Sequence, residues 1–141
     1  MLKNSLRKIL LIFTTVFIFT SCVNTLQMAA QETPLELIPK NKVMGGFSFV
    51  IPDNFRFINE QSLIYDYKGD IRAYLVYAGK ASTVQLINFF TDYMPEKGWK
   101  PDFATVSTDG ILAFKKEDRL IIIKITPDVA GISYIKILLT K

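Results

Sequence analysis

One segment of this chain, from Ser82 to Gly98, carries the periodicity of an amphipathic helix. When successive residues turn through about 100°, six apolar side chains fall within one arc of roughly 160°. They are Leu86, Ile87, Phe89, Phe90, Tyr93 and Met94. Ser82 and Gln85 have the spacing of a capping box, and Gly98 suits a left-handed stop. We therefore predict one helix from Thr83 to about Lys97, whose last turn is kinked or ended by Pro95.

The segments on either side of this helix have the composition of β-strands. They are rich in Val, Ile, Tyr and Phe, and turn residues such as Gly69-Asp70 and Asp109-Gly110 separate them. The predicted strands are residues 47–51, 62–68, 71–78, 99–107, 111–116, 120–126 and 132–139. Both faces of 120–125 are apolar, which favours a central position for that strand. The order β-β-β-α-β-β-β-β predicts an α+β fold, with an antiparallel sheet of about six to seven strands and one helix packed across one face.

The start of the chain has the features of an export signal. Lys3, Arg7 and Lys8 precede an uncharged run of 11 residues from Ile9 to Phe19, and small residues follow up to Cys22. A helix needs about 20 apolar residues to cross a hydrocarbon core about 30 Å thick, so this run is short for a permanent span. The alternative is an uncleaved signal-anchor helix in which Cys22 is an ordinary thiol.

The sequence Phe19-Thr20-Ser21-Cys22 resembles the lipobox of bacterial lipoproteins, although Phe19 replaces the usual aliphatic residue. The resemblance implies cleavage before Cys22 and lipidation of that cysteine. It also implies more than one acyl chain, which is enough for stable attachment to a membrane. Val23 stands where an Asp would favour the inner membrane in enterobacterial lipoproteins. We therefore expect the outer membrane, facing the periplasm, in a host that has one, and the cell surface otherwise.

Three regions follow from this interpretation: a signal peptide of residues 1–21, a lipidated N-terminus and flexible tether of residues 22–44, and one α+β domain of residues 45–141. Residues 23–42 lack sustained apolar periodicity, which is typical of a tether. The alternative is that Pro34–Pro39 adds an edge segment to the domain. Because the sole cysteine lies at the lipobox, no disulfide is expected.

Most of the basic excess of the sequence belongs to the signal. The whole chain has 17 basic and 13 acidic residues, and three of the basic ones precede Cys22. The remaining 14 basic residues nearly balance the 13 acidic ones, so the mature chain has a net charge of about +1. This near balance is not that of a strongly basic nucleic-acid-binding domain, and we predict no nucleic-acid partner.

The sequence carries no recognisable catalytic motif. It has no His, and its one Cys is expected to carry the anchor, so the commonest general base and the usual zinc ligands are missing. Gly45-Gly46 lacks the pattern of a phosphate-binding loop. Asp66, Asp70 and Asp118 lie near predicted hairpin ends, where solvated turn residues are favoured over a pair of catalytic carboxylates. We therefore predict a protein that is not an enzyme and that has no cofactor and no metal site.

Two groups of side chains are candidates for a surface role. Tyr65, Tyr67, Tyr74 and Tyr77 lie on neighbouring predicted strands, where they could form an interaction surface opposite the helix. The alternative for them is ordinary cross-strand aromatic packing. Lys115, Lys116, Arg119 and Lys124 form a basic cluster on one predicted hairpin, suited either to anionic head groups or to a solvated hairpin tip.

Residues 74–79, 90–99 and 114–119 resemble a group of small uncharacterised bacterial lipoproteins, over roughly residues 48–125. More loosely, the chain is similar to helix-on-sheet domains in a lipoprotein subunit of the outer-membrane barrel-assembly machinery. These resemblances imply a non-enzymatic interaction or accessory module of the cell envelope, which binds the membrane through Cys22 and another envelope protein through its sheet. The alternative is a binder of a small hydrophobic or lipid ligand, which needs a roomy pocket between Phe90 and the sheet.

Overall fold

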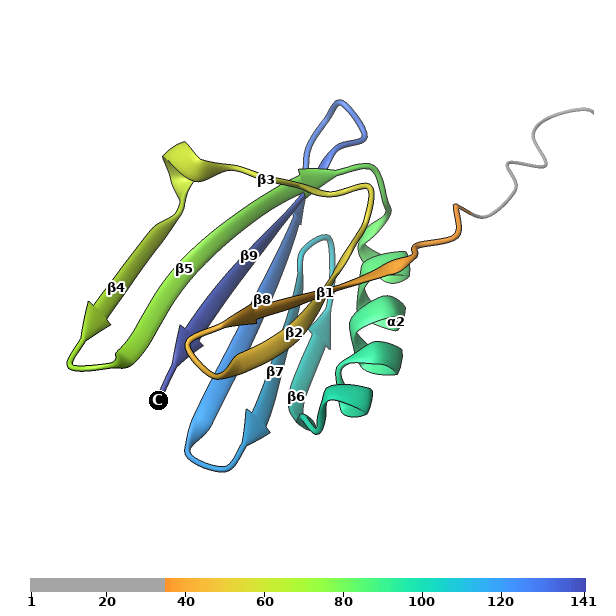
Figure 1. Ribbon diagram of the computed structural model, residues 1–141. Coiled ribbons are helices and arrows are strands. Elements are labelled where there is room, and N and C mark those ends of the chain that lie inside the picture. The colour runs from red at the N-terminus through yellow and green to blue at the C-terminus, as the bar shows by residue number, and fades with distance from the viewer. Residues whose placement is uncertain (1–34) are drawn as a thin grey trace, which may run out of the picture. The chain divides into compact units, whose positions relative to one another are not determined.

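The computed structural model describes residues 35–141, which form a large sheet with one face covered by a helix and a hairpin (Figure 1). The strands before the helix are β1 (Pro39–Met44), β2 (Phe47–Pro52), β3 (Arg56–Phe57), β4 (Leu63–Tyr67) and β5 (Asp70–Gly79). Helix α2 (Thr83–Tyr93) is followed by β6 (Lys100–Val106), β7 (Gly110–Lys116), β8 (Arg119–Pro127) and β9 (Ser133–Thr140). The α+β class is confirmed. The signal peptide, Cys22 and the first part of the expected tether lie outside the described residues.

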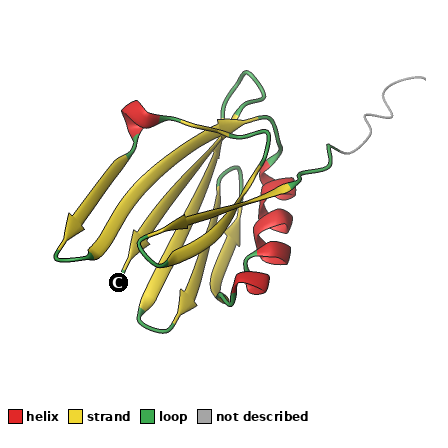
Figure 2. Ribbon diagram, viewed as in Figure 1, coloured by secondary structure: helices red, strands yellow, loops and turns green. Residues whose placement is uncertain are grey.

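The large sheet has seven strands, and each pairing within it is antiparallel. Its order is β3-β5-β9-β8-β7-β6, and β4 pairs with β5 beside β3 (Figure 1). The same view coloured by secondary structure shows the helix beside the strands of the sheet (Figure 2). Strand β8 lies between β9 and β7, which confirms the central position predicted from its apolar residues. No helix in residues 35–141 is both long enough and apolar enough to span a bilayer.

The first predicted strand forms, but it lies outside the large sheet. As β2, it pairs with β1 in a separate two-stranded sheet that crosses over the large one (Figure 1). The prediction of a flexible tether over residues 22–44 is wrong for residues 39–44, which form β1, so the folded domain begins before residue 45. The polar run Lys40-Asn41-Lys42 gave no strand signal because most side chains of β1 are exposed. Backbone pairing with β2 and the packing of Met44 against the core hold this strand in place.

The turn between β1 and β2 depends on two glycines. Gly45 and Gly46 have φ values of +52° and +80°, the left-handed conformation that a two-residue hairpin turn of type I′ requires. A Cβ atom on Gly45 would overlap the side chain of Ile71 in β5. Arg119 of β8 donates a hydrogen bond of 3.0 Å to the carbonyl of Gly46, and its guanidinium lies 5.6 Å from the centre of the Phe47 ring. The hairpin is therefore fastened to two strands of the large sheet.

Helix α2 begins at the predicted capping box. The amide of Gln85 donates to Ser82 Oγ at 3.2 Å, and the amide of Ser82 donates to Gln85 Oε1 at 2.8 Å. The α-helix stops before Pro95, as the missing amide hydrogen of proline dictates, and continues as the 3₁₀ turn Pro95–Lys97. Gly98 ends that turn with φ +83°. The helix packs against β6, β7, β8 and β2.

Trp99 joins the end of the helix to the hairpin. Its side chain is buried, with 2% exposed, and its ring stacks on Phe47 with the two centroids 6.1 Å apart. The indole Nε1–H donates a hydrogen bond of 2.6 Å to the carbonyl of Ser48 in β2. This contact supplies the polar partner that a buried tryptophan needs.

Candidate functional site

The face of the large sheet opposite α2 has no covering helix or strand within residues 35–141. Side chains alternate between the two faces along each strand. In the central strands β8 and β9, Ile121, Ile123 and Ile125, and likewise Ile135, Ile137 and Leu139, point into the core and are at most 1% exposed. The residues between them lie on the other face, which we call the open face.

A row of apolar residues crosses the open face from one edge of the sheet to the other. Strand register places one such residue on each of six neighbouring strands. In spatial order they are Leu63, Tyr74, Leu138, Ile122, Ala113 and Phe103, and we call them the apolar row. Five strand spacings make it about 24 Å long. The two ends of the row are the most exposed, since Leu63 is 68% and Phe103 50% exposed, whereas Ala113, next to Phe103 in the row, is 6% exposed.

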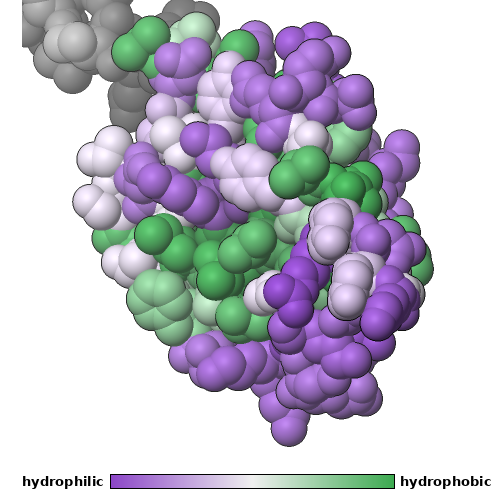
Figure 3. All heavy atoms as spheres, turned by 90° about the vertical axis from the view of Figure 1, so that its left-hand side faces the viewer, coloured by the Kyte–Doolittle hydropathy of each residue, from purple (hydrophilic) through white to green (hydrophobic). Residues whose placement is uncertain are grey.

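The molecule viewed from the β4 side shows hydrophobic residues gathered in a band across the middle, with hydrophilic residues above and below (Figure 3). Single exposed apolar side chains are common on soluble proteins. A continuous row bordered by polar residues is different, because such patches mark interaction sites. The apolar row is therefore the strongest candidate for a binding surface in the described residues.

Basic residues border the apolar row on both sides. Lys136 and Lys124 occupy adjacent positions on β9 and β8, directly opposite one another, an arrangement of like charges that costs stability. Asp109 lies 3.4 Å from Lys124 and offsets part of this cost. On the other side of the row, Lys115 pairs with Lys100 in register and forms an ion pair of 2.9 Å with Asp102. The open face thus combines apolar and cationic groups.

The predicted basic cluster is divided between the two faces. Lys115 and Lys124 border the apolar row, whereas Lys116 and Arg119 lie on the core side. Lys116 Nζ donates a hydrogen bond of 2.8 Å to the carbonyl of Lys97, at the end of the 3₁₀ turn. Arg119 fastens the β1–β2 hairpin, as described above. Two of the four residues therefore have structural roles.

Three of the four candidate tyrosines share the open face. Tyr74 belongs to the apolar row, and Tyr65 and Tyr67 stand beside it on β4. The rings of Tyr65 and Tyr67 are stacked, with centroids 6.5 Å apart and planes inclined by 4°. Tyr77 is separate from them: it faces the core, is 5% exposed and packs against Phe57 with ring centroids 5.3 Å apart.

Burial of Tyr77 predicts a loss of stability in alkali. Desolvation raises the pKa of its phenol above the ordinary value of 10.0, because the charged phenolate is disfavoured in the core. The folded state then holds its proton more tightly than the unfolded state, so stability is full below pH 10 and falls as the pH rises further. Urea titrations from pH 8 to 11 should show a smaller loss for Tyr77→Phe than for the wild type. Val84→Ala, at an exposed position without a phenol, should behave like the wild type. Equal losses in all three chains would contradict the assignment.

The carboxylates considered as catalytic candidates have turn and surface roles. Asp66 Oδ1 accepts a hydrogen bond of 2.9 Å from the amide of Gly69, within the turn between β4 and β5. Asp118 lies 3.3 Å from the amine of Lys141. Among residues 35–141, no group of three His, Cys, Asp or Glu side chains could hold a metal ion.

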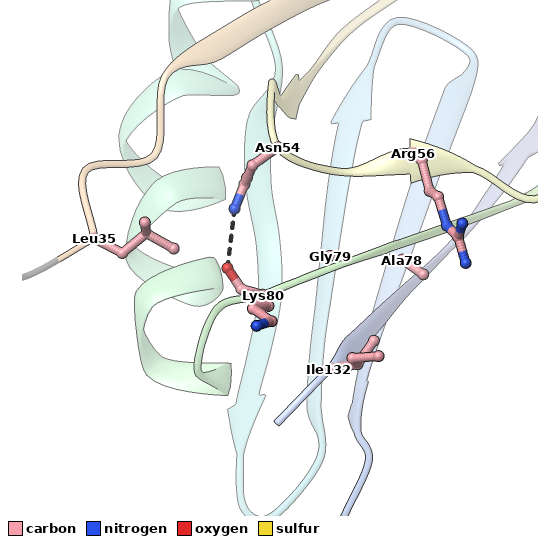
Figure 4. A pocket seen from close by; sticks show the side chains of 7 residues that line it. All are labelled: Leu35, Asn54, Arg56, Ala78, Gly79, Lys80 and Ile132. Carbon is pink, nitrogen blue, oxygen red and sulfur yellow. Dashed lines mark hydrogen bonds between the residues drawn. The ribbon is translucent and has the colours of Figure 1, made fainter. Parts of the chain in front are cut away.

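Two pockets lie where β3 crosses the end of the sheet. The first, of about 420 Å³, is lined by Leu35, Asn54, Arg56, Ala78, Gly79, Lys80 and Ile132 (Figure 4). Two of these lining residues are joined directly, since the Asn54 side chain donates a hydrogen bond of 3.0 Å to the Lys80 carbonyl. The second, of about 360 Å³, shares Arg56, Ala78 and Ile132 with the first. Neither is lined by a residue of α2, and at the contact of helix and sheet Leu86, Phe90 and Met94 are 0% exposed.

Comparison with protein-family models, with curated proteins and with solved structures finds no match to this chain. A functional interpretation of the domain therefore depends on its own surface. Sequence reasoning identified Tyr74 but missed Leu63, Leu138, Ile122 and Phe103. The alternation of each strand could have placed these residues on a common face, but only the register between strands aligns them in one row.

Proposed function

We propose that this protein is a non-enzymatic module of the cell envelope that is anchored to a membrane by a lipid on Cys22 and binds another envelope protein through its open face. The observation that carries the proposal is the apolar row, which crosses an uncovered sheet face. The lipobox resemblance of residues 19–22 supports the anchor, and the basic border of the row supports a partner with acidic groups beside an apolar surface.

The energetics of the apolar row favour a protein partner. Fully burying a Leu or Phe side chain is worth roughly 1.5–3 kcal/mol, and four members of the row are between 39% and 68% exposed. A partner that covers them gains part of this free energy from each. Stable interfaces bury about 800 Å² on each partner and concentrate binding energy in a few central residues, often aromatic. Tyr74 and Leu138, adjacent in the row, suit that central position.

The filled contact between α2 and the sheet favours this function over the carriage of a lipid between them. A carrier needs an apolar cavity there. Leu86, Phe90 and Met94 leave no exposed surface at that contact, and the two pockets lie elsewhere. A ligand between helix and sheet would have to displace close-packed side chains, and overpacking a core typically costs about 1–3 kcal/mol.

Crosslinking from the open face tests the protein partner. A photoreactive residue at position 138, in the full-length chain in its own host, should give one defined adduct with an envelope protein. The same residue at position 84 is the matched control, because Val84 is comparably exposed, at 59%, but lies on α2. The proposal fails if the two positions give the same adducts, or if position 138 reacts only with lipid.

The anchor is tested by replacing the cysteine. Cys22→Ala should move the protein from the membrane fraction to the soluble fraction, because an acylated cysteine with more than one chain is the only stable attachment that we propose. Intact mass of the wild type should correspond to a chain that begins at Cys22 and carries acyl groups. A chain that begins at Met1 would contradict the anchor but would leave the open face as a binding surface.

A further inference from the structure

Strand β4 forms one exposed edge of the sheet. It pairs with β5 on one side, and no strand within residues 35–141 pairs with its other side. All five of its residues are exposed, and four of them are large and apolar or aromatic: Leu63, Ile64, Tyr65 and Tyr67. An edge strand of this kind offers unpaired backbone groups and apolar side chains to another chain.

The opposite edge of the sheet, β6, is also exposed, but its first residues have features that oppose pairing with another strand. Strand β6 begins with Lys100 and Pro101, and its register shifts at a bulge between Pro101 and Phe103. Lysine, proline and bulges at an edge are the features that keep sheets from pairing with one another. Strand β4 has no proline, lysine or bulge, and Asp66 is its only charged residue. This contrast indicates that the β4 edge is covered in the functional state.

We propose that β4 pairs with β4 of a second copy of this chain, antiparallel about a twofold axis at Tyr65, so that the two large sheets become one continuous sheet. The pairing does not depend on the partner that binds the apolar row. It places both open faces on the same side, so the dimer presents two apolar rows next to each other. Packing of the two open faces against each other is disfavoured, because it would bring the lysine borders together.

The choice of axis follows from the side chains of β4. In an antiparallel pair, directly opposed residues lie on the same face of the sheet. A twofold axis between two copies of β4 must therefore pass beside a residue that is opposed to the same residue of the second copy. An axis at Tyr65 sets Leu63 against Tyr67 of the partner subunit and Ile64 against Asp66 of the partner subunit. An axis at Asp66 would oppose two carboxylates. An axis at Ile64 would leave Tyr67 opposite Gln61 of the partner subunit, which lies in a 3₁₀ turn. Only the axis at Tyr65 pairs the whole strand without like charges.

A cysteine on the axis tests this pairing. Directly opposed residues in antiparallel strands have Cα atoms about 4.5–5.5 Å apart, within the range of a disulfide. The full-length Tyr65→Cys chain, treated with a mild oxidant in membranes from its host, should give a disulfide-linked species of twice the monomer mass. The wild type measures any contribution from Cys22, and Val84→Cys measures random collision of exposed thiols. Both should give at least tenfold less of this species.

Two further variants check the register. Ile64→Cys and Asp66→Cys, expressed together, should form a mixed disulfide, whereas each expressed alone should remain mostly monomeric. A Tyr65→Cys chain that stays monomeric, or that is no more dimeric than Val84→Cys, overturns the proposal. A disulfide from position 65 to a different protein also overturns it, because the edge then belongs to that partner. Adducts from position 138 are scored separately, so failure of the dimer is distinguishable from failure of the proposed function.

Discussion

Replacing Leu138 with Asp is expected to weaken capture of the envelope partner by at least about 30-fold, the effect of losing a central hot-spot residue worth about 2 kcal/mol or more. Leu138 lies in the apolar row between Tyr74 and Ile122, and a carboxylate there would have to be desolvated inside the interface. The measurement is the yield of partner adduct from a photoreactive residue at position 103, at the far end of the same row.

Stability distinguishes loss of binding from loss of folding in this experiment. Leu138 is 41% exposed, so its replacement by Asp should lower the free energy of unfolding by only about 1 kcal/mol, mainly through strand propensity. Val43→Asp is the matched control, because Val43 is 76% exposed on β1, away from the open face. Undiminished capture by Leu138→Asp, or an equal loss with Val43→Asp, would show that the apolar row is not the binding surface.

Trp99→Ala is expected to give the largest loss of stability of any single substitution considered for this domain. Removing a buried aromatic side chain typically costs about 3–5 kcal/mol, against a total stability of about 5–15 kcal/mol for a domain. Here the change would also remove the stacking on Phe47 and leave the Ser48 carbonyl without its donor. Urea unfolding followed by circular dichroism should show either an unfolded chain or a much lower midpoint.

Trp99→Phe separates the hydrogen bond from the packing. It keeps an aromatic ring against Phe47 but removes the indole N–H, so the loss should be about 1–3 kcal/mol. If Trp99→Ala is no less stable than Trp99→Phe, the ring does not anchor the hairpin. If both match the wild type, the contact with Ser48 contributes nothing to the fold.

Most of the secondary structure was predictable because its signals are local. Ser82 and Gln85 cap the helix, Pro95 ends it, and the turn glycines separate the strands, all within a few residues of one another. Strand β1 escaped prediction because its polar, exposed side chains show no alternation. Strand β3 escaped because it has only two residues, Arg56 and Phe57. Each of these strands is a strand only because its backbone pairs with another one. The partner of β1 is β2, which follows it directly in the sequence, whereas the partner of β3 is β5, which lies further along the chain.

The candidate site was predictable only in part. The four tyrosines were chosen as a group from their positions on neighbouring strands, but odd and even positions of one strand lie on opposite faces. Tyr74 and Tyr77 are three residues apart in β5, and they therefore point to opposite sides of the sheet, one exposed and one buried. The alternation of side chains along this strand was therefore enough to predict that Tyr77 lies apart from Tyr74.

By itself, the sequence determined the fold class, the boundaries of the helix and the central place of β8, because these follow from periodicity, capping and composition along the chain. Only the tertiary structure decided that β2 leaves the large sheet to cover it, that Trp99 reaches Ser48, and that six residues form one apolar row. The physical reason is that register and layer packing join residues far apart in sequence. Their free energy comes from burial and pairing across elements, which no local pattern encodes.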